Sequence, residues 1–158
     1  MQSRIKPKNK QNFFQKFLIL LYFGFFSINY VKANPITLEG VASAIDGDTI
    51  IINNYKIRLN GVSAPELNEE GGNEAKQAMQ KILENQTIKC SLSGRKSYER
   101  HIGVCWIGAV DVGALLVLQG FARDCFRYSG GRYSALEPGP ARYLPLPQYC
   151  LARTQKTN

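Results

Sequence analysis

Between Asp46 and Glu66 the sequence places carboxylates and an arginine at a spacing suited to phosphate chemistry. Asp46 and Asp48 flank a glycine in a tight turn, and Glu66 follows a proline that stiffens the backbone. Carboxylates on turns are oxygen ligands of the kind that Ca²⁺ or Mg²⁺ prefers. Arg58 precedes Glu66 by eight residues, and a guanidinium held beside such carboxylates stabilises the charge that builds on a phosphodiester in its transition state. The order and spacing of these residues therefore indicate hydrolysis of a phosphate ester.

Other interpretations of the polar residues have less support. Asp-Gly-Asp is also an ordinary turn, and a strand arginine often faces solvent, so neither element is specific alone. Ser63, Ser129 and Ser134 have no histidine at a spacing that would make a nucleophile. His101, the one histidine of the chain, follows Arg100 next to a predicted strand and is interpreted as structural or solvated. The sequence has neither a G-x-x-x-x-G-K-[ST] loop nor a G-x-G-x-x-G motif, which argues against nucleotide-binding folds.

Short strands are expected to position these side chains, and the third of them shows alternating apolar and polar residues. In the third strand this alternation places Arg58 on the face opposite Tyr55, Ile57 and Leu59. Five strands are predicted, over residues 38–45, 49–52, 55–59, 87–92 and 103–106. The connections expected between them are the turns at 46–48 and 53–54 and the polar stretches 61–72 and 94–101.

Two helices are predicted among the strands. An apolar stripe with helical spacing covers residues 75–83, and Asn73 is its expected cap. Asp111 is expected to cap a second helix over residues 112–119, which Gly120 ends. The predicted fold class is therefore α+β and mainly β: a five-stranded barrel of the OB type with two or three helices packed outside.

The N-terminus has the pattern of an export signal. Residues 1–16 are polar and basic, residues 17–28 form an apolar run, and small residues precede a cut after Ala33. The run is shorter than the roughly 20 apolar residues that a membrane-spanning helix needs, although an uncleaved anchor stays an alternative. All six charged residues before Asn34 are basic, and the other 14 basic and 12 acidic residues nearly balance. The net charge of +8 therefore says little about the folded domain.

Four cysteines follow the predicted signal, none of them in a C-x-x-C pair, and with a single histidine in the chain they disfavour a zinc site. Two disulfides in an oxidising compartment fit better. Of the three connectivities, we expect Cys90–Cys105 and Cys125–Cys150, which join neighbours in sequence. The expected domains are a signal peptide (1–33), a barrel domain (34–126) and a tail rich in Gly, Pro and Arg that Cys150 ties back (127–158).

These motifs together resemble the thermonuclease, or staphylococcal-nuclease-like, family. The similarity rests on Ile45–Thr49 (IDGDT), Ile57–Leu59 (IRL), Ala64–Glu66 (APE), Tyr98–Arg100 (YER, where the family has Tyr-Gly-Arg) and Val117–Ala122 (VLQGFA). It extends from about Val41 to Ala122. The tail is similar to that of exported bacterial homologues and is assigned no part in catalysis. The resemblance implies metal-dependent hydrolysis of DNA and RNA backbones with little sequence preference.

The resemblance also implies roles for individual residues. Asp48 and the backbone carbonyl of Ala64 would ligate Ca²⁺ or another divalent cation. Glu66 would be the general base, or would orient the attacking water. Arg58 and Arg100 would hold the phosphate and stabilise the transition state.

Two positions depart from the family pattern. Ser63 stands where the family has an aspartate as a second charged metal ligand, and a hydroxyl can coordinate but brings no charge. We therefore expect weaker Ca²⁺ binding or the use of another divalent ion, with Glu69 or Glu70 as candidates to compensate. Glu99 replaces a glycine before Arg100, which could alter the aim of that arginine.

The distribution of charge and tyrosines adds a weaker indication. Residues 34–94 hold 5 basic and 8 acidic residues, whereas residues 95–158 hold 9 basic and 4 acidic ones. The basic part could face a nucleic-acid backbone. Tyr98, Tyr128 and Tyr133 lie among its arginines, where stacking on bases and packing on the barrel are equally supported.

Three hypotheses follow from the sequence. The first is a secreted or periplasmic nuclease that acts on DNA and/or RNA as a monomer, without stable membrane association once the signal is cleaved. The second is a nucleic-acid-binding barrel of the same fold, with catalysis weakened by Ser63. The third is an envelope interaction module, against which the joint presence of Asp48, Arg58, Glu66 and Arg100 argues.

Overall fold

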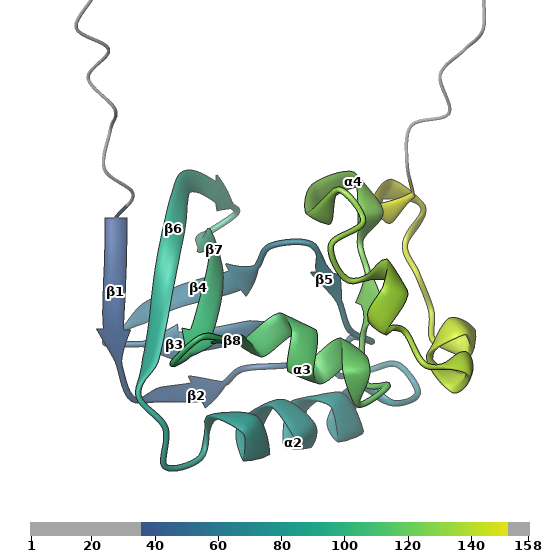
Figure 1. Ribbon diagram of the computed structural model, residues 1–158, viewed down its shortest axis with the longest axis horizontal. Coiled ribbons are helices and arrows are strands. Elements are labelled where there is room, and N and C mark those ends of the chain that lie inside the picture. Colours follow the sequence, from purple (N-terminus) through teal and green to yellow (C-terminus); the bar gives the residue numbers. More distant parts are fainter. Residues whose placement is uncertain (1–35, 152–158) are drawn as a thin grey trace, which may run out of the picture. The chain divides into compact units, whose positions relative to one another are not determined.

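The computed structural model describes residues 36–151 (Figure 1). The predicted export signal, residues 1–33, lies outside the described residues. Within residues 36–151, no helix is long and apolar enough to span a membrane. The described part is mainly β, with two sheets and three α-helices.

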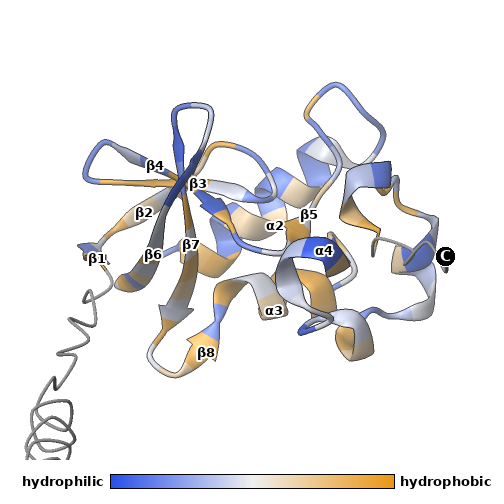
Figure 2. Cartoon of the chain, turned by 90° about the horizontal axis from the view of Figure 1, so that it is seen from above, coloured by the Kyte–Doolittle hydropathy of each residue, from blue (hydrophilic) through white to orange (hydrophobic). Residues whose placement is uncertain are grey.

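One curled sheet carries most of the residues of interest (Figure 1, Figure 2). Its strands are β1 (Ile36–Gly40), β2 (Ala42–Ala44), β3 (Thr49–Ile52), β4 (Tyr55–Leu59), β6 (Ile88–Ser97), β7 (Arg100–Ile107) and β8 (Val110–Asp111). They follow the order β1-β6-β7-β4-β3-β2, with β8 beside β7, and β4 and β7 form the one parallel pair of this sheet. Because only Val41 separates β1 from β2, one bent strand occupies both edges and the sheet curls back toward itself. The predicted OB-type fold is confirmed.

The strand count agrees with the prediction once the bent strand is counted as one. Five long strands then form the barrel: β1 with β2, β3, β4, β6 and β7. The predicted turn after β3 is also confirmed, since Asn53 and Asn54 both have positive φ. A second sheet was not predicted: β5 (Val62–Ser63), inside the stretch expected to be a polar loop, pairs with β9 (Arg123–Asp124). Strands of two residues are too short to show an alternating pattern.

Two helices cover the curled sheet and complete its core. α2 (Gly72–Leu83) and α3 (Val112–Leu118) pack against each other, α2 against β2 and α3 against β7 (Figure 1). The predicted apolar stripe of α2 is buried through Ala75, Ala78, Met79 and Leu83. These side chains meet strand residues such as Ile50 in one apolar cluster, and burial of this kind contributes roughly 25 cal/mol per Å².

The start of α2 differs from the prediction, which took Asn73 as the cap. The helix begins at Gly72, after Gly71 with a φ of 84°, and no side chain caps it. A Cβ atom at position 72 would lie 1.9 Å from the carbonyl oxygen of Glu66, so only glycine fits there. The loop that leads into the helix folds back on Gly72, and this contact, which the apolar periodicity of the helix does not reveal, marks where the helix begins. By contrast, Asp111 caps α3 as predicted.

The prediction of a polar connection over residues 94–101 is wrong. β6 and β7 extend into it and form a long hairpin, in which Ser97 pairs with Arg100. Its residues are mostly exposed, so the apolar alternation that would reveal a half-buried strand is missing. In the turn of this hairpin Tyr98, with a φ of 54°, has the left-handed conformation, and Glu99 does not. Position 99 therefore does not need the positive φ that would favour glycine there.

The two predicted disulfides are confirmed. Cys90–Cys105 joins directly opposed residues of β6 and β7. Cys125–Cys150 closes the C-terminal segment, residues 126–151, onto the end of β9. This segment consists of α4 (Phe126–Ser129) and the short 3-10 helices η1 (Ser134–Leu136), η2 (Gly139–Tyr143) and η3 (Gln148–Cys150).

Removing the Cys125–Cys150 disulfide should destabilise the C-terminal segment. The bond closes a loop with a sequence separation of 25, and loss of such a constraint costs about 3 kcal/mol through the unfolded state. We expect the Cys125→Ala/Cys150→Ala variant to unfold in urea with a free energy lower by that amount. An unchanged unfolding midpoint would show that this bond does not stabilise the segment.

Candidate active site

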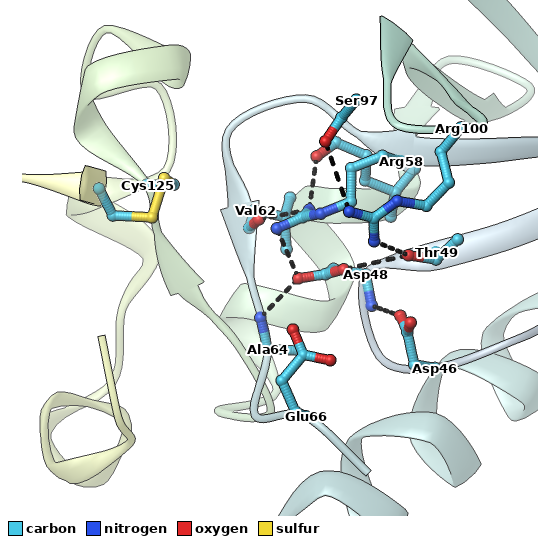
Figure 3. A network of polar contacts seen from close by, with 12 residues as sticks. Asp46, Asp48, Thr49, Arg58, Val62, Ala64, Glu66, Ser97, Arg100 and Cys125 are labelled. Carbon is cyan, nitrogen blue, oxygen red and sulfur yellow. Dashed lines mark hydrogen bonds and ion pairs between the residues drawn. A yellow bond between two sulfur atoms is a disulfide. The ribbon is translucent and has the colours of Figure 1, made fainter. Parts of the chain in front are cut away.

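Asp48 is the centre of a buried polar network where β3 and β4 meet the loop after β5 (Figure 3). Only 5% of the residue is exposed. Its Oδ2 atom lies 2.8 Å from Nη2 of Arg58 and accepts a hydrogen bond from the N–H of Ala64 at 3.0 Å. Its Oδ1 atom accepts a hydrogen bond from the Thr49 hydroxyl at 3.3 Å. One carboxylate thus connects three segments that are separate in sequence.

The Asp-Gly-Asp turn brings this carboxylate inside. Oδ1 of Asp46 accepts the N–H of Asp48 at 2.9 Å, which shapes the turn. A Cβ atom at Gly47 would lie 2.5 Å from the Cβ of Ala64 and 2.8 Å from that of Ala75. Glycine therefore lets the turn pack against both α2 and the loop. The two aspartates consequently differ in role: one forms the turn, and the other presents its carboxylate to the site.

The buried carboxylate has an unusual proton affinity. Burial raises the pKa of Asp48 to about 6, and the Arg58 guanidinium opposes that rise. The neighbouring carboxylates of Asp46 and Glu66 raise the pKa further. A charge held inside the protein with one cationic partner is therefore only partly compensated.

Arg58 is fixed in place by both the carboxylate and the backbone. Nη1 of Arg58 donates to the carbonyl oxygens of Leu59 at 3.0 Å and Val62 at 2.7 Å, while Nη2 contacts Asp48. Its side chain is 15% exposed. The guanidinium is thus preorganised and still reaches the surface at one edge.

Arg100 joins the same network from β7. Its Nη1 donates to Oγ1 of Thr49 at 3.2 Å and its Nη2 to Oγ of Ser97 at 3.4 Å (Figure 3). Since the Thr49 hydroxyl also donates to Asp48, one threonine connects the second arginine to the buried carboxylate. Sequence reasoning missed this residue, although it directly follows the Asp-Gly-Asp turn.

Glu66 is exposed and lies on the loop between β5 and α2. Its N–H donates to Oε2 of Glu69 at 2.8 Å, and the N–H of Glu69 donates back to the carbonyl of Glu66 at 2.9 Å. The structure thus distinguishes the two glutamates that were considered as replacements for the missing metal ligand. Glu69 holds the backbone of Glu66 and lines the site, whereas Glu70 lines neither of the two pockets described next.

Two adjoining pockets open around these residues. The larger, of about 550 Å³, contains both arginines, Glu66 and the basic tip of the β6–β7 hairpin with Arg95 and Lys96. The smaller, of about 300 Å³, is lined by Asp48, Arg58, Ser63, Ala64, Glu66, Glu69, Pro145, Leu146, Pro147 and Tyr149. All six residues predicted for the site therefore line these pockets. Residues from the C-terminal segment were not predicted to do so.

The smaller pocket offers both charged and neutral oxygen ligands. Asp48, Glu66 and Glu69 line it with carboxylates, and Ser63 and Ala64 supply neutral oxygens. Among residues 36–151, no three His, Cys, Asp or Glu side chains lie close enough together to hold a metal ion. This donor set fits a hard divalent cation that retains several waters, as Mg²⁺ or weakly bound Ca²⁺ does.

Of the remaining tyrosine and histidine candidates, some line a pocket and others have a structural role. Tyr133 is 1% exposed and donates its hydroxyl to Asp111 at 2.9 Å, so it packs on the barrel. Tyr98 and Tyr128 line the larger pocket. The ring of His101 lies 5.6 Å from that of Tyr55, away from the pockets, which supports a structural role.

Comparison with known proteins agrees with the fold. The model of the Staphylococcal nuclease homologue family matches residues 56–137. The succinoglycan biosynthesis protein ExoI of Rhizobium meliloti (strain 1021) is 33% identical over 144 residues, covering 80% of this chain and 74% of its own. A probable staphylococcal-like nuclease, CAN1 of Oryza sativa subsp. japonica, is 30% identical over 76 residues, covering 48% of this chain and 23% of the rice protein.

The structure is thus a curled OB-type barrel with a buried carboxylate and two arginines beside its pockets. With the family match and the similarity to ExoI, the chain belongs to the Staphylococcal nuclease homologue family. This family is generally Ca²⁺-dependent.

The raised pKa of Asp48 predicts a stability that falls with pH in metal-free protein. The folded state keeps the proton up to about pH 6, while the unfolded state releases it near 3.8. Folding is therefore favoured most below that lower value, and the advantage is lost as pH rises through about 6, by on the order of 3 kcal/mol. Urea unfolding in EDTA between pH 3.5 and 7 measures this change. Asp48→Asn should flatten the profile, and equal slopes in both proteins would contradict the assignment.

Proposed function

We propose that this protein is an exported, metal-dependent nuclease that hydrolyses phosphodiester bonds of DNA and/or RNA with little sequence preference. The observation that carries the proposal is the convergence of Arg58, Arg100 and Glu66 on one pocket, in front of the buried Asp48. Two guanidinium groups suit the charged oxygens of a phosphodiester, and an exposed carboxylate beside them can act on water. Family membership supports nuclease activity independently of this geometry.

The arginines would bind the phosphate and stabilise its transition state. Arg58 is already held by Asp48 and two carbonyl groups, so ordering it around a substrate costs little. Arg100 contacts only two hydroxyl groups, which a phosphate oxygen can replace as a stronger acceptor. The first arginine is therefore a fixed anchor, and the second is free to follow the charge that develops on phosphorus.

Glu66 would accept the proton of the attacking water. Its exposed side chain lies at the junction of both pockets, and Glu69 fixes the backbone beneath it. A divalent cation, when bound, supplies Lewis-acid stabilisation of the phosphate oxygens. Asp48, Ser63 and the carbonyl of Ala64 would hold it, with Glu66 within reach of the same pocket.

We propose that the protein acts outside the cytoplasm. Two disulfides per chain are typical of the periplasm or of secreted proteins. Together with the predicted signal peptide at residues 1–33, they support export, and we propose that the mature protein is a monomer that does not stay at the membrane. The tail, residues 127–158, is proposed as a segment attached to the barrel domain of residues 34–126.

A second candidate is a nucleic-acid-binding barrel with weakened catalysis. It is favoured by Ser63, which leaves the smaller pocket short of one carboxylate, and by the absence of a three-acid cluster among residues 36–151. Both candidates require nucleic acid to bind at the arginines. They differ in whether Glu66 has a reaction to catalyse.

The Glu66→Gln variant separates these two functions. In the nuclease, loss of the base should lower the cleavage rate by roughly 10²–10⁴ while binding of DNA is largely retained. Arg100→Ala should lower the rate by roughly 10²–10³. Cleavage of single-stranded and duplex DNA with Ca²⁺, Mg²⁺ or Mn²⁺, against EDTA, measures both effects. Glu70→Gln, on the same loop but outside the pockets, is the matched control. Metal-dependent binding without cleavage by the unmodified protein would favour the second candidate.

Restoring a carboxylate at position 63 tests the metal site. Because affinity for Ca²⁺ rises with the number of charged ligands, Ser63→Asp should bind Ca²⁺ about ten-fold more tightly in calorimetric titration. Asp48→Asn should weaken the binding of the same ion. If Ser63→Asp leaves the Ca²⁺ affinity unchanged, the smaller pocket is not the metal site.

A further inference from the structure

Tyr149 occupies a position that neither the sequence nor the family match pointed to. It lies in η3, beyond the matched residues 56–137. Three residues line both pockets: Arg58, Glu66 and Tyr149. The C-terminal segment therefore places an aromatic ring directly beside the groups that would bind and hydrolyse a phosphodiester.

We propose that Tyr149 stacks on a nucleobase next to the phosphate at the arginines, so that the C-terminal segment makes affinity depend on the base. This inference rests on the proposed binding of nucleic acid at the same site. An exposed aromatic face beside a basic groove is the common platform for single-stranded nucleic acid, and every base can stack on it. A base-stacking residue from this segment adds recognition of the nucleobase to recognition of the phosphate.

The ring of Tyr149 is exposed and yet held in position. The residue is 51% exposed. Its ring lies 6.5 Å from that of Tyr128, tilted by 55°, so one edge is supported while much of the side chain stays accessible. Cys150, the next residue, is fully buried and bonded to Cys125, which begins the turn that carries Tyr128. The disulfide thus restrains the backbone near both tyrosines, which lowers the entropy lost when a base stacks.

The approach to this ring is basic. Arg95 and Lys96, from the tip of the β6–β7 hairpin, line the larger pocket together with Tyr128 and Tyr149. Their charges suit the phosphates on either side of a bound nucleotide, and such contacts contribute affinity that does not depend on the base. The pocket therefore combines a charged wall for the backbone with an aromatic wall for the base.

None of the other tyrosines of the region lines both pockets, and Tyr128, which is 45% exposed, lines only the larger one. Tyr133 is buried, and Tyr143, which is 92% exposed in the same segment, lines neither pocket. Tyr98 lines only the larger pocket, at the exposed tip of the hairpin. Tyr143 accordingly serves as a matched control: it has the same side chain, in the same segment, away from the site.

The test compares two single-stranded octamers that have equal phosphate charge. One is octathymidylate and the other is an octamer of abasic tetrahydrofuran units, each labelled with fluorescein and titrated by anisotropy. The protein is the oxidised chain carrying Glu66→Gln, so that neither octamer is cleaved during binding. Cleavage by the chain with Glu66 intact is measured in parallel, which reports on the nuclease activity separately.

We expect Tyr149→Leu to weaken binding of octathymidylate about ten-fold and to leave binding of the abasic octamer unchanged, as loss of one stacked base predicts. Tyr149→Phe, which keeps the ring, should preserve the preference for bases, and Tyr143→Leu should not alter it. Arg95→Ala should weaken both octamers to a similar degree and lower the salt dependence of binding. This contrast separates contacts to the base from contacts to the backbone.

Two results would overturn the inference. One is an unchanged preference for bases in Tyr149→Leu. The other is an equal loss of affinity for both octamers in Tyr149→Leu, which would show that the ring only supports the pocket. If neither octamer binds the parent protein, the proposed function fails together with this inference. If cleavage is absent but the base preference responds to Tyr149, the nuclease proposal fails and the stacking site stands.

Discussion

The ion pair between Asp48 and Arg58 is the interaction on which the rest of the site depends. Its carboxylate also accepts the N–H of Ala64, so one buried charge fixes β4, the turn before β3 and the loop that carries Glu66. Removing one partner from a buried pair leaves the other charge uncompensated, which is far costlier than losing an exposed salt bridge. The barrel is therefore organised around a charge that its own core does not fully neutralise.

The incomplete neutralisation of Asp48 connects the stability of the fold with the binding of a ligand. Burial opposes the charged form of Asp48 more strongly than Arg58 favours it, which gives the raised pKa. A cation in the smaller pocket would favour the same charged form. A phosphate at the arginines would instead occupy the free edges of guanidinium groups that the protein has already ordered. The fold thus keeps a costly arrangement beside a pocket in which a bound cation would compensate it.

The C-terminal segment forms one wall of the candidate site. Pro145, Leu146 and Pro147 line the smaller pocket beside Asp48, and Arg123 at the end of the barrel donates to the carbonyl of Leu144. The family match ends at residue 137, so the family model does not extend to residues 145–147 of this wall. Relatives with the same barrel and another C-terminal segment would present the same arginines in a differently shaped pocket.

The sequence by itself determined the local features. Alternation identified the strand that buries Ile57, and helical spacing identified the buried stripe of α2, because both patterns depend on neighbours a few residues apart. The order of Asp48, Arg58 and Glu66 indicated the chemistry. The order of the four cysteines along the sequence likewise predicted the two disulfide pairs. Tertiary structure decided what depends on distant contacts. Arg100 reaches Thr49, 51 positions away in the sequence, because β7 pairs with β4, and Tyr149 reaches the site because a disulfide returns the chain to β9. Such approaches are set by packing in space, and no local pattern encodes them.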